Sequence, residues 1–88
     1  MKIQNLTAEQ CIHIAKIAEP TIDWNFVENQ PNKWDGFDLL GEKQEDGSYD
    51  GIFQISFSGH FSFFDEGLNE YKVSGQEKQQ IIKYLESL

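Results

Sequence analysis

The stretch FQISFSGHFSF, residues 53–63, decides the fold of this chain. The odd-numbered residues of this stretch are apolar, apart from Gly59: they are Phe53, Ile55, Phe57, Phe61 and Phe63. Glutamine, serine and histidine occupy the even-numbered positions. Because successive side chains of a strand point to opposite faces, this period of two predicts half-buried strand. The apolar parity is expected to form the centre of the core.

Two arrangements of this stretch fit the pattern. The first is one long strand bent at Gly59, and the second is a hairpin whose loop is Ser58 to His60. The hairpin would place Phe57 opposite Phe61. Both arrangements bury the same five apolar side chains, so the periodicity leaves the choice between them open.

Shorter strands are predicted on either side of this stretch. They are expected around the alternating residues Ile22, Trp24 and Phe26, over residues 34–42, and as an edge strand over 68–73. Turn-forming residues separate the strands at 29–32, 45–48 and 65–67. The sequence therefore predicts an antiparallel meander of four to five strands.

A helix is predicted at each end of the meander. Thr7 with Gln10, and Ser74 with Glu77, have the spacing of a capping box, and an apolar stripe at helical spacing follows each box. The first helix is expected to stop before Pro20. Together these elements predict a single α+β domain over residues 1–88, with both helices on one face of the sheet.

Charge and composition limit the partners. The chain has 15 acidic residues against 7 lysines, no arginine, and a net charge of −8. Phosphate groups would be repelled, so we expect no direct binding to nucleic acid. No apolar run is long enough for a membrane span, and the first residues lack a signal-peptide pattern, which favours the cytoplasm. The single Cys11 cannot form an internal disulfide or a zinc site, and no cofactor is expected.

Acidic and aromatic residues between positions 34 and 64 form the predicted contact surface. The acidic members are Asp35, Asp38, Glu42, Glu45, Asp46 and Asp50, and the aromatic members are Trp34, Tyr49 and Phe64. Such a surface is expected to bind another protein, because acidic groups steer basic partners and aromatic rings are enriched in interfaces. A phage-type inhibitor or a nucleic-acid mimic is the sharper form of this hypothesis. Homodimerisation through the sheet face or an edge strand is a further expectation.

Two other patterns carry chemistry in some proteins. Asp46, Ser48 and Asp50 have the spacing of the first half of a calcium loop, but Phe57 stands where the last ligand belongs, so we interpret them as a hairpin turn and expect no metal site. Ser58, His60 and Asp65 include the residue types of a catalytic triad without a nucleophile elbow. We expect no enzyme. The alternative is a small-ligand or metal-dependent activity centred on His60 and the serine-lined face of the sheet.

Both ends of the chain show a resemblance to known sequences. The opening segment NLTAEQCI at residues 5–12, followed by Ile14, Ala15 and Lys16, resembles the start of short uncharacterised proteins of gut Bacteroidales and their phages. The closing segment, residues 80–88, is similar to the ends of such proteins. The resemblance covers about a third of the chain. No activity is attached to that group, so the resemblance implies no functional residue.

Overall fold

Two capping boxes set where the helices begin. Thr7 Oγ1 accepts a hydrogen bond from Gln10 N at 3.2 Å, and Thr7 N donates to Gln10 Oε1 at 2.8 Å. Ser74 and Glu77 repeat this reciprocal pair at the second helix. Both predicted boxes are confirmed, and each satisfies backbone donors that a helix end leaves unpaired. The computed structural model describes residues 2–28 and 34–88, so the predicted turn at 29–32 lies outside the described residues.

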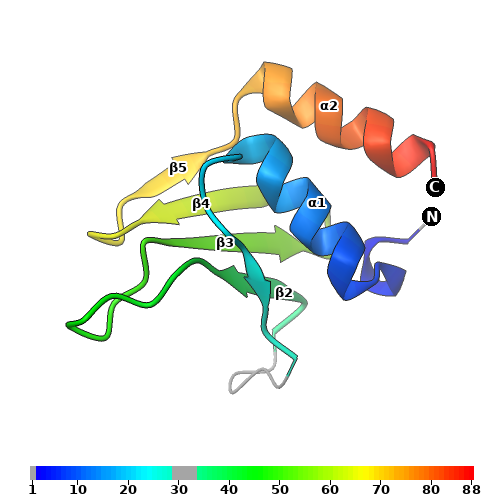
Figure 1. The fold of residues 1–88 in the computed structure, drawn as a ribbon. Helices are drawn as coiled ribbons and strands as arrows, with labels where there is room; N and C mark the ends of the chain where they lie inside the picture. Colours follow the sequence, from blue (N-terminus) through cyan, green and yellow to red (C-terminus); the bar gives the residue numbers. More distant parts are fainter. Residues whose placement is uncertain (1, 29–33) are drawn as a thin grey trace.

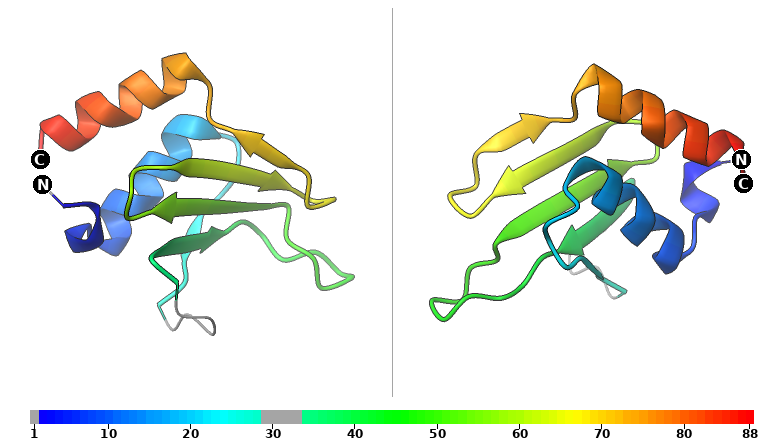
Figure 2. Two further views of the ribbon diagram at one scale, coloured as in Figure 1. Left: turned by 180° about the vertical axis from the view of Figure 1, so that it is seen from behind. Right: turned by 45° about the horizontal axis from the view of Figure 1, so that its top comes forward.

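The strands form a five-stranded antiparallel sheet in the order β1-β2-β3-β4-β5. The elements are η1 (Ile3–Asn5), α1 (Ala8–Ala18), β1 (Asn25–Phe26), β2 (Gly36–Leu40), β3 (Gly51–Ser56), β4 (Phe61–Asp65), β5 (Glu70–Lys72) and α2 (Gly75–Glu86). Figure 1 and Figure 2 show both helices on the same side of the sheet, with α2 against α1. The predicted α+β fold is confirmed, including the shared face of the helices.

The core lies between the helices and one face of the sheet. Phe53 and Ile55 of the central strand β3 are fully buried, and their backbone alternation leaves Gln54 on the other face. The buried set is Leu6, Cys11, Ile14, Ala15, Trp24, Leu39, Phe53, Ile55, Phe61 and Ile81. Each sheet strand from β2 to β4 and both helices contribute to this set, and Ile81 is the contribution of α2.

The stretch at 53–63 is a hairpin, and its register differs from the predicted one. Ile55 pairs with Phe61, so the loop between the paired strands comprises residues 57–59 and Phe57 belongs to the loop. The predicted pairing of Phe57 with Phe61 is wrong. The backbone of Gly59 explains the shift, because its φ of 96° fits the left-handed position that ends a three-residue loop. Phe57 packs its ring edge-on against Phe37 at 5.1 Å and is half-buried at the edge of the core.

The first strand is shorter than predicted. Asn25 and Phe26 pair with β2, and Val27 N donates to the Asp38 carbonyl at 3.2 Å, so the pairing begins three residues after Ile22, where the alternation begins. The partner strand β2 ends at Leu40, which is already opposite Asn25, so no ladder remains for the residues before it. Trp24 instead anchors this segment, because its indole Nε1 donates to the Glu19 carbonyl at the end of α1 at 3.1 Å.

Three hairpin loops repeat one backbone design. In each loop, the backbone N–H of a first residue donates to the carbonyl of the residue four positions later. The carbonyl of that first residue accepts a hydrogen bond from the N–H of the residue three positions later. The first residues are Gln44, Ser56 and Asp65. The last loop residue has positive φ in all three: 89° at Gly47, 96° at Gly59 and 61° at Leu68. Leucine therefore occupies a position that favours glycine, and its side chain is 68% exposed.

This repeat predicts opposite effects of substitution in two loops. Leu68→Gly is expected to raise the free energy of unfolding by up to about 1 kcal/mol, because it removes left-handed strain while losing few side-chain contacts. Gly59→Ala is expected to lower it by roughly 1–2 kcal/mol, since the nearest atom to a Cβ there is 4.0 Å away and the cost is one of backbone conformation. Urea unfolding followed by circular dichroism measures both. A marked loss of stability in Leu68→Gly would contradict the assignment of strain to this position.

Candidate functional site

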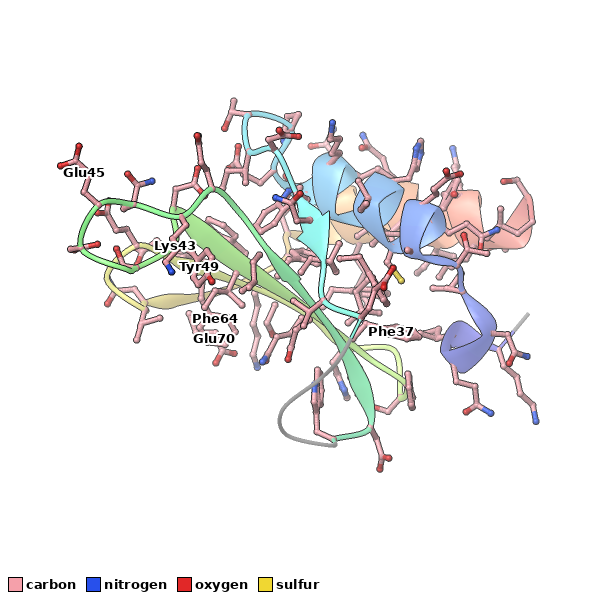
Figure 3. The ribbon with its side chains drawn as sticks, turned by 60° about the horizontal axis from the view of Figure 1, so that its bottom comes forward. Phe37, Lys43, Glu45, Tyr49, Phe64 and Glu70 are labelled. Atoms are coloured by element: carbon pink, nitrogen blue, oxygen red, sulfur yellow. The ribbon has the colours of Figure 1, made fainter. Side chains whose placement is uncertain are left out.

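The face of the sheet turned away from the helices, which we call the open face, carries an apolar row across three strands. Leu40 in β2 pairs with Ile52 in β3, and Ile52 pairs with Phe64 in β4. All three side chains are half-buried. Figure 3 shows Phe64 on the side of the sheet away from the helices, beside Glu70, its partner in β5. Direct cross-strand neighbours contact one another, so the row is continuous.

Polar side chains border this apolar row. Asp38 pairs with Gln54, and Gln54 pairs with Ser62, so the next rung of the open face is polar across the same three strands. This order, an apolar row beside an acidic and amide row, gives a surface on which a ligand segment would meet both kinds of group.

Trp34 and Asp38 carry the two buried side-chain polar atoms without a hydrogen-bond partner among the described residues. These atoms are Trp34 Nε1, a donor, and Asp38 Oδ1, an acceptor. The Trp34 ring lies over Gly36, where a Cβ would collide with it, so the indole covers the end of β2. Buried polar groups in proteins are nearly always paired, so an unpaired donor and acceptor beside one strand mark a place where another molecule or water supplies the bonds.

The six acidic residues of the predicted surface do not form one patch. Asp38 lies on the open face, and exposed Glu45 and Asp46 lie at the tip of the β2–β3 hairpin. Asp50 has a structural role, because its Oδ1 accepts a hydrogen bond from Glu42 N at 2.6 Å at the base of the hairpin. Asp35 lies just before β2, where its carbonyl accepts from Phe57 N.

The hairpin tip is held by its own side chains. Asp46 Oδ1 accepts hydrogen bonds from Ser48 Oγ at 2.6 Å and from Ser48 N at 2.9 Å. These bonds to the Ser48 hydroxyl and amide hold the pKa of Asp46 below its usual value of 3.8. The interpretation of this segment as a polar hairpin turn is confirmed.

Tyr49 lies close to the base of the same hairpin. It forms an isolated antiparallel bridge with Lys43, and its side chain is half-buried. In Figure 3 both residues are drawn on the same side of the ribbon as Phe64 and Glu70, whereas Glu45 projects from the hairpin tip and Phe37 lies towards η1. The predicted aromatic members Tyr49 and Phe64 thus share a side of the sheet.

The serine and histidine side chains near the β3–β4 turn form a hydrogen-bonded chain. Ser56 Oγ lies 2.7 Å from Ser58 Oγ, and Ser58 Oγ lies 3.1 Å from His60 Nδ1. His60 also lines a hollow of about 310 Å³ together with Phe61, Ser62, Glu70, Lys72, Val73 and Lys78. The alternative site predicted around His60 therefore has a concave surface beside it.

Asp65 does not complete a triad with Ser58 and His60. Its Oδ1 accepts hydrogen bonds from the backbone N–H groups of Asn69 and Gly67, at 2.9 and 3.0 Å, in the turn at the other end of β4. The hydrogen bond from the backbone N–H of Asn69 is the main cause that lowers the pKa of Asp65 below its usual value of 3.8. Tyr71 donates its hydroxyl to Asp65 Oδ2 at 3.1 Å, and this bond raises the pKa of Tyr71. The carboxylate is thus committed to the turn.

Neither a reactive thiol nor a cluster of metal-ligating side chains is found in the described part of the chain. Cys11 is fully buried in α1, and desolvation raises the pKa of its thiol to about 11, so it exists as the unreactive thiol near neutral pH. Within residues 2–28 and 34–88, no three His, Cys, Asp or Glu side chains are grouped to hold a metal ion.

Sequence reasoning named Phe64 but missed its neighbours Leu40 and Ile52. The missed signal is a set of apolar doublets at 39–40, 52–53 and 63–64. A doublet puts one apolar side chain on each face of a strand. The observed register aligns all three doublets, so one row enters the core and the other row forms on the open face.

Comparison with known proteins yields no match to any family model, to any curated protein or to any solved structure. In the described part of the chain, none of the helices is long and apolar enough to cross a membrane.

Proposed function

We propose that this protein binds another protein through the open face of its sheet. The observation that carries the proposal is the row Leu40, Ile52 and Phe64, which stands on the face that neither helix covers. Contiguous apolar surface of this kind is typical of interaction sites. The bound protein replaces the water that otherwise covers these half-buried side chains.

The partner's contact segment is expected to be basic and to carry apolar side chains. Asp38 borders the apolar row, Glu45 and Asp46 extend the negative surface beyond it, and the whole chain has a net charge of −8. Complementary charge speeds association and excludes acidic competitors.

The sharper form of the proposal is a phage-type inhibitor or nucleic-acid mimic acting in the cytoplasm, in which the carboxylates stand in for phosphates in a basic groove. In that form the partner is a nucleic-acid-binding protein, and duplex DNA displaces it from this chain. A partner that DNA does not displace would leave protein binding in place and remove the mimicry.

The test is capture of partners from the native host, compared between variants. Ile52→Lys places a positive charge in the middle of the apolar row. The amount of each wild-type partner that this variant captures is therefore expected to be at least tenfold lower, as measured by quantitative mass spectrometry. Gln80→Lys is the matched control, since it adds the same charge on the exposed face of α2. Circular dichroism verifies that both variants are folded. Undiminished capture by a folded Ile52→Lys variant would contradict binding at the open face.

A second candidate function is the binding of a small anionic ligand in the hollow beside His60. The observation that favours it is that His60, Lys72 and Lys78 line one hollow of a strongly acidic chain, where Glu70 is the one carboxylate among the lining residues. This candidate requires ligand binding that disappears in His60→Ala and persists in Ile52→Lys. The opposite pattern supports the open face.

A further inference from the structure

The edge strand β5 has backbone groups that face away from the sheet. Asp65 N donates to the Asn69 carbonyl at 3.1 Å, and hydrogen-bonded pairs alternate along an antiparallel ladder. The next bonded pair along the ladder is therefore Phe63 with Tyr71, and the pairs Phe64–Glu70 and Ser62–Lys72 are not bonded to each other. The N–H and C=O groups of Glu70 and Lys72 consequently point outward, and β5 is the last strand of the described sheet.

We propose that β5 pairs with β5 of a second copy of this chain, antiparallel and centred on Tyr71, so that one sheet continues through a two-fold axis. In this register Glu70 of each copy lies opposite Lys72 of the other. The outward N–H and C=O groups of these two residues then form two reciprocal pairs of hydrogen bonds, as an antiparallel ladder requires. Tyr71 meets its own copy at the axis, in the position where a ladder brings side chains closest.

Charge selects this register over its neighbours. Centring the pairing on residue 70 would place two glutamates opposite each other, and centring it on residue 72 would place two lysines opposite each other. Like charges directly opposite destabilise a strand pair, whereas opposite charges stabilise it. The order Glu70, Tyr71, Lys72 is self-complementary only about its middle residue, as a two-fold interface requires.

The surroundings of β5 can receive the Glu70 carboxylate of a second copy. Lys72 lines the hollow of about 310 Å³ together with Lys78, His60 and Glu70 of the same chain. Among the described residues, no carboxylate lies at ion-pair distance from either lysine. Two lysines thus share the hollow with one carboxylate, which leaves positive charge for the Glu70 that the second copy brings.

Two of the three exposed large hydrophobic side chains of the described residues lie in this hairpin, and the third is Leu88. Leu68 and Tyr71 are 68% and 54% exposed, and they lie in the β4–β5 turn and in β5. The Tyr71 ring is already fixed, because it stacks on Phe63 at 6.2 Å and its hydroxyl donates to Asp65. Little conformational freedom of the Tyr71 side chain is therefore lost when a second copy covers it.

Sedimentation equilibrium of the full 10.2 kDa chain tests the pairing. Three-residue strands bury little surface, so the dimer is expected to be weak, with a dissociation constant in the micromolar to millimolar range. Glu70→Lys and Lys72→Glu, made separately, each set like charges opposite each other twice and are expected to raise the dissociation constant at least tenfold. The double variant Glu70→Lys/Lys72→Glu restores both pairs and is expected to return to within about threefold of the wild-type constant.

Two controls separate this edge from other causes. Lys43→Glu changes the net charge as much as Lys72→Glu but lies outside β5, so it is expected to leave the dissociation constant unchanged. Leu40→Ser removes a side chain from the open face, and it too is expected to leave dimerisation intact. A wild-type chain that stays monomeric into the millimolar range, or a double variant that fails to recover while its circular dichroism matches the wild type, would overturn the proposal.

Discussion

Phe53→Ala is expected to lower the free energy of unfolding by about 3–5 kcal/mol, the range found for removing a buried aromatic ring. Phe53 has no solvent-exposed surface, and it is the largest fully buried side chain among the described residues. Its direct strand partners are Leu39 and Phe63, so a cavity there would be enclosed by two other strands. Rigid strands on both sides limit collapse of the cavity and push the cost towards the upper end.

The effect is large relative to the stability of so small a domain. For 88 residues the total free energy of unfolding is expected to be about 4–13 kcal/mol. The midpoint of thermal unfolding should therefore fall by roughly 12–40 °C. Gln54→Ala in the same strand is the matched control, because its side chain faces the open side, and its cost is expected to stay below about 1 kcal/mol. Similar losses in both variants, measured by urea and thermal unfolding, would show that β3 lacks the two-sided character described here.

Trp24→Ala is expected to cost about 3–5 kcal/mol as well, for a partly different reason. Trp24 is 3% exposed and packs its ring against Phe53 at 5.9 Å and against Phe63 at 6.0 Å, the latter edge-on. Its Nε1 also donates to the carbonyl of Glu19, which caps α1. The substitution therefore removes core packing and also releases the end of the helix from the sheet.

Trp24→Phe separates these two contributions. It keeps an aromatic ring in the core and removes the hydrogen bond to Glu19, so its cost is expected to be about 1–3 kcal/mol. Circular dichroism is the suitable probe, because both changes alter tryptophan fluorescence. A cost for Trp24→Phe as large as that for Trp24→Ala would mean that the hydrogen bond outweighs the packing of the ring.

The local signals in the sequence predict the helices well. Thr7 and Ser74 both form their capping boxes, and α1 ends at Ala18, before Pro20, because these features depend on residues within one or two turns. The class of the sheet was also predictable, since alternation fixes which side chains of β3 and β4 face the core. Such alternation is a property of each strand alone.

The hairpin register was not predictable from alternation. Pairing Phe57 with Phe61 and pairing Ile55 with Phe61 both keep the odd-numbered side chains on one face, so burial does not distinguish them. The decision rests on Gly59, which has to occupy the last loop position with positive φ. The same logic fails at the third hairpin, where Leu68 rather than Gly67 takes that position.

The candidate surface was predictable in part. Trp34, Asp38 and Phe64 lie beside or on the open face, but Asp50 is used to hold the base of its hairpin and Glu45 and Asp46 occupy the tip. Acidic composition locates charge in the sequence without locating it on a face. The row through Leu40 and Ile52 needs the register of three strands, which no single strand carries.

The position of Ile81 has a consequence for synthesis of the chain on the ribosome. This fully buried residue lies in α2, which follows all five strands along the chain, and it joins a core cluster that begins at Leu6. Chains are made from the N-terminus at about 5–20 residues per second, so the ribosome completes all five strands before it makes the residue that finishes their core. Until α2 is made, only α1 covers the phenylalanine-rich side of the nascent sheet.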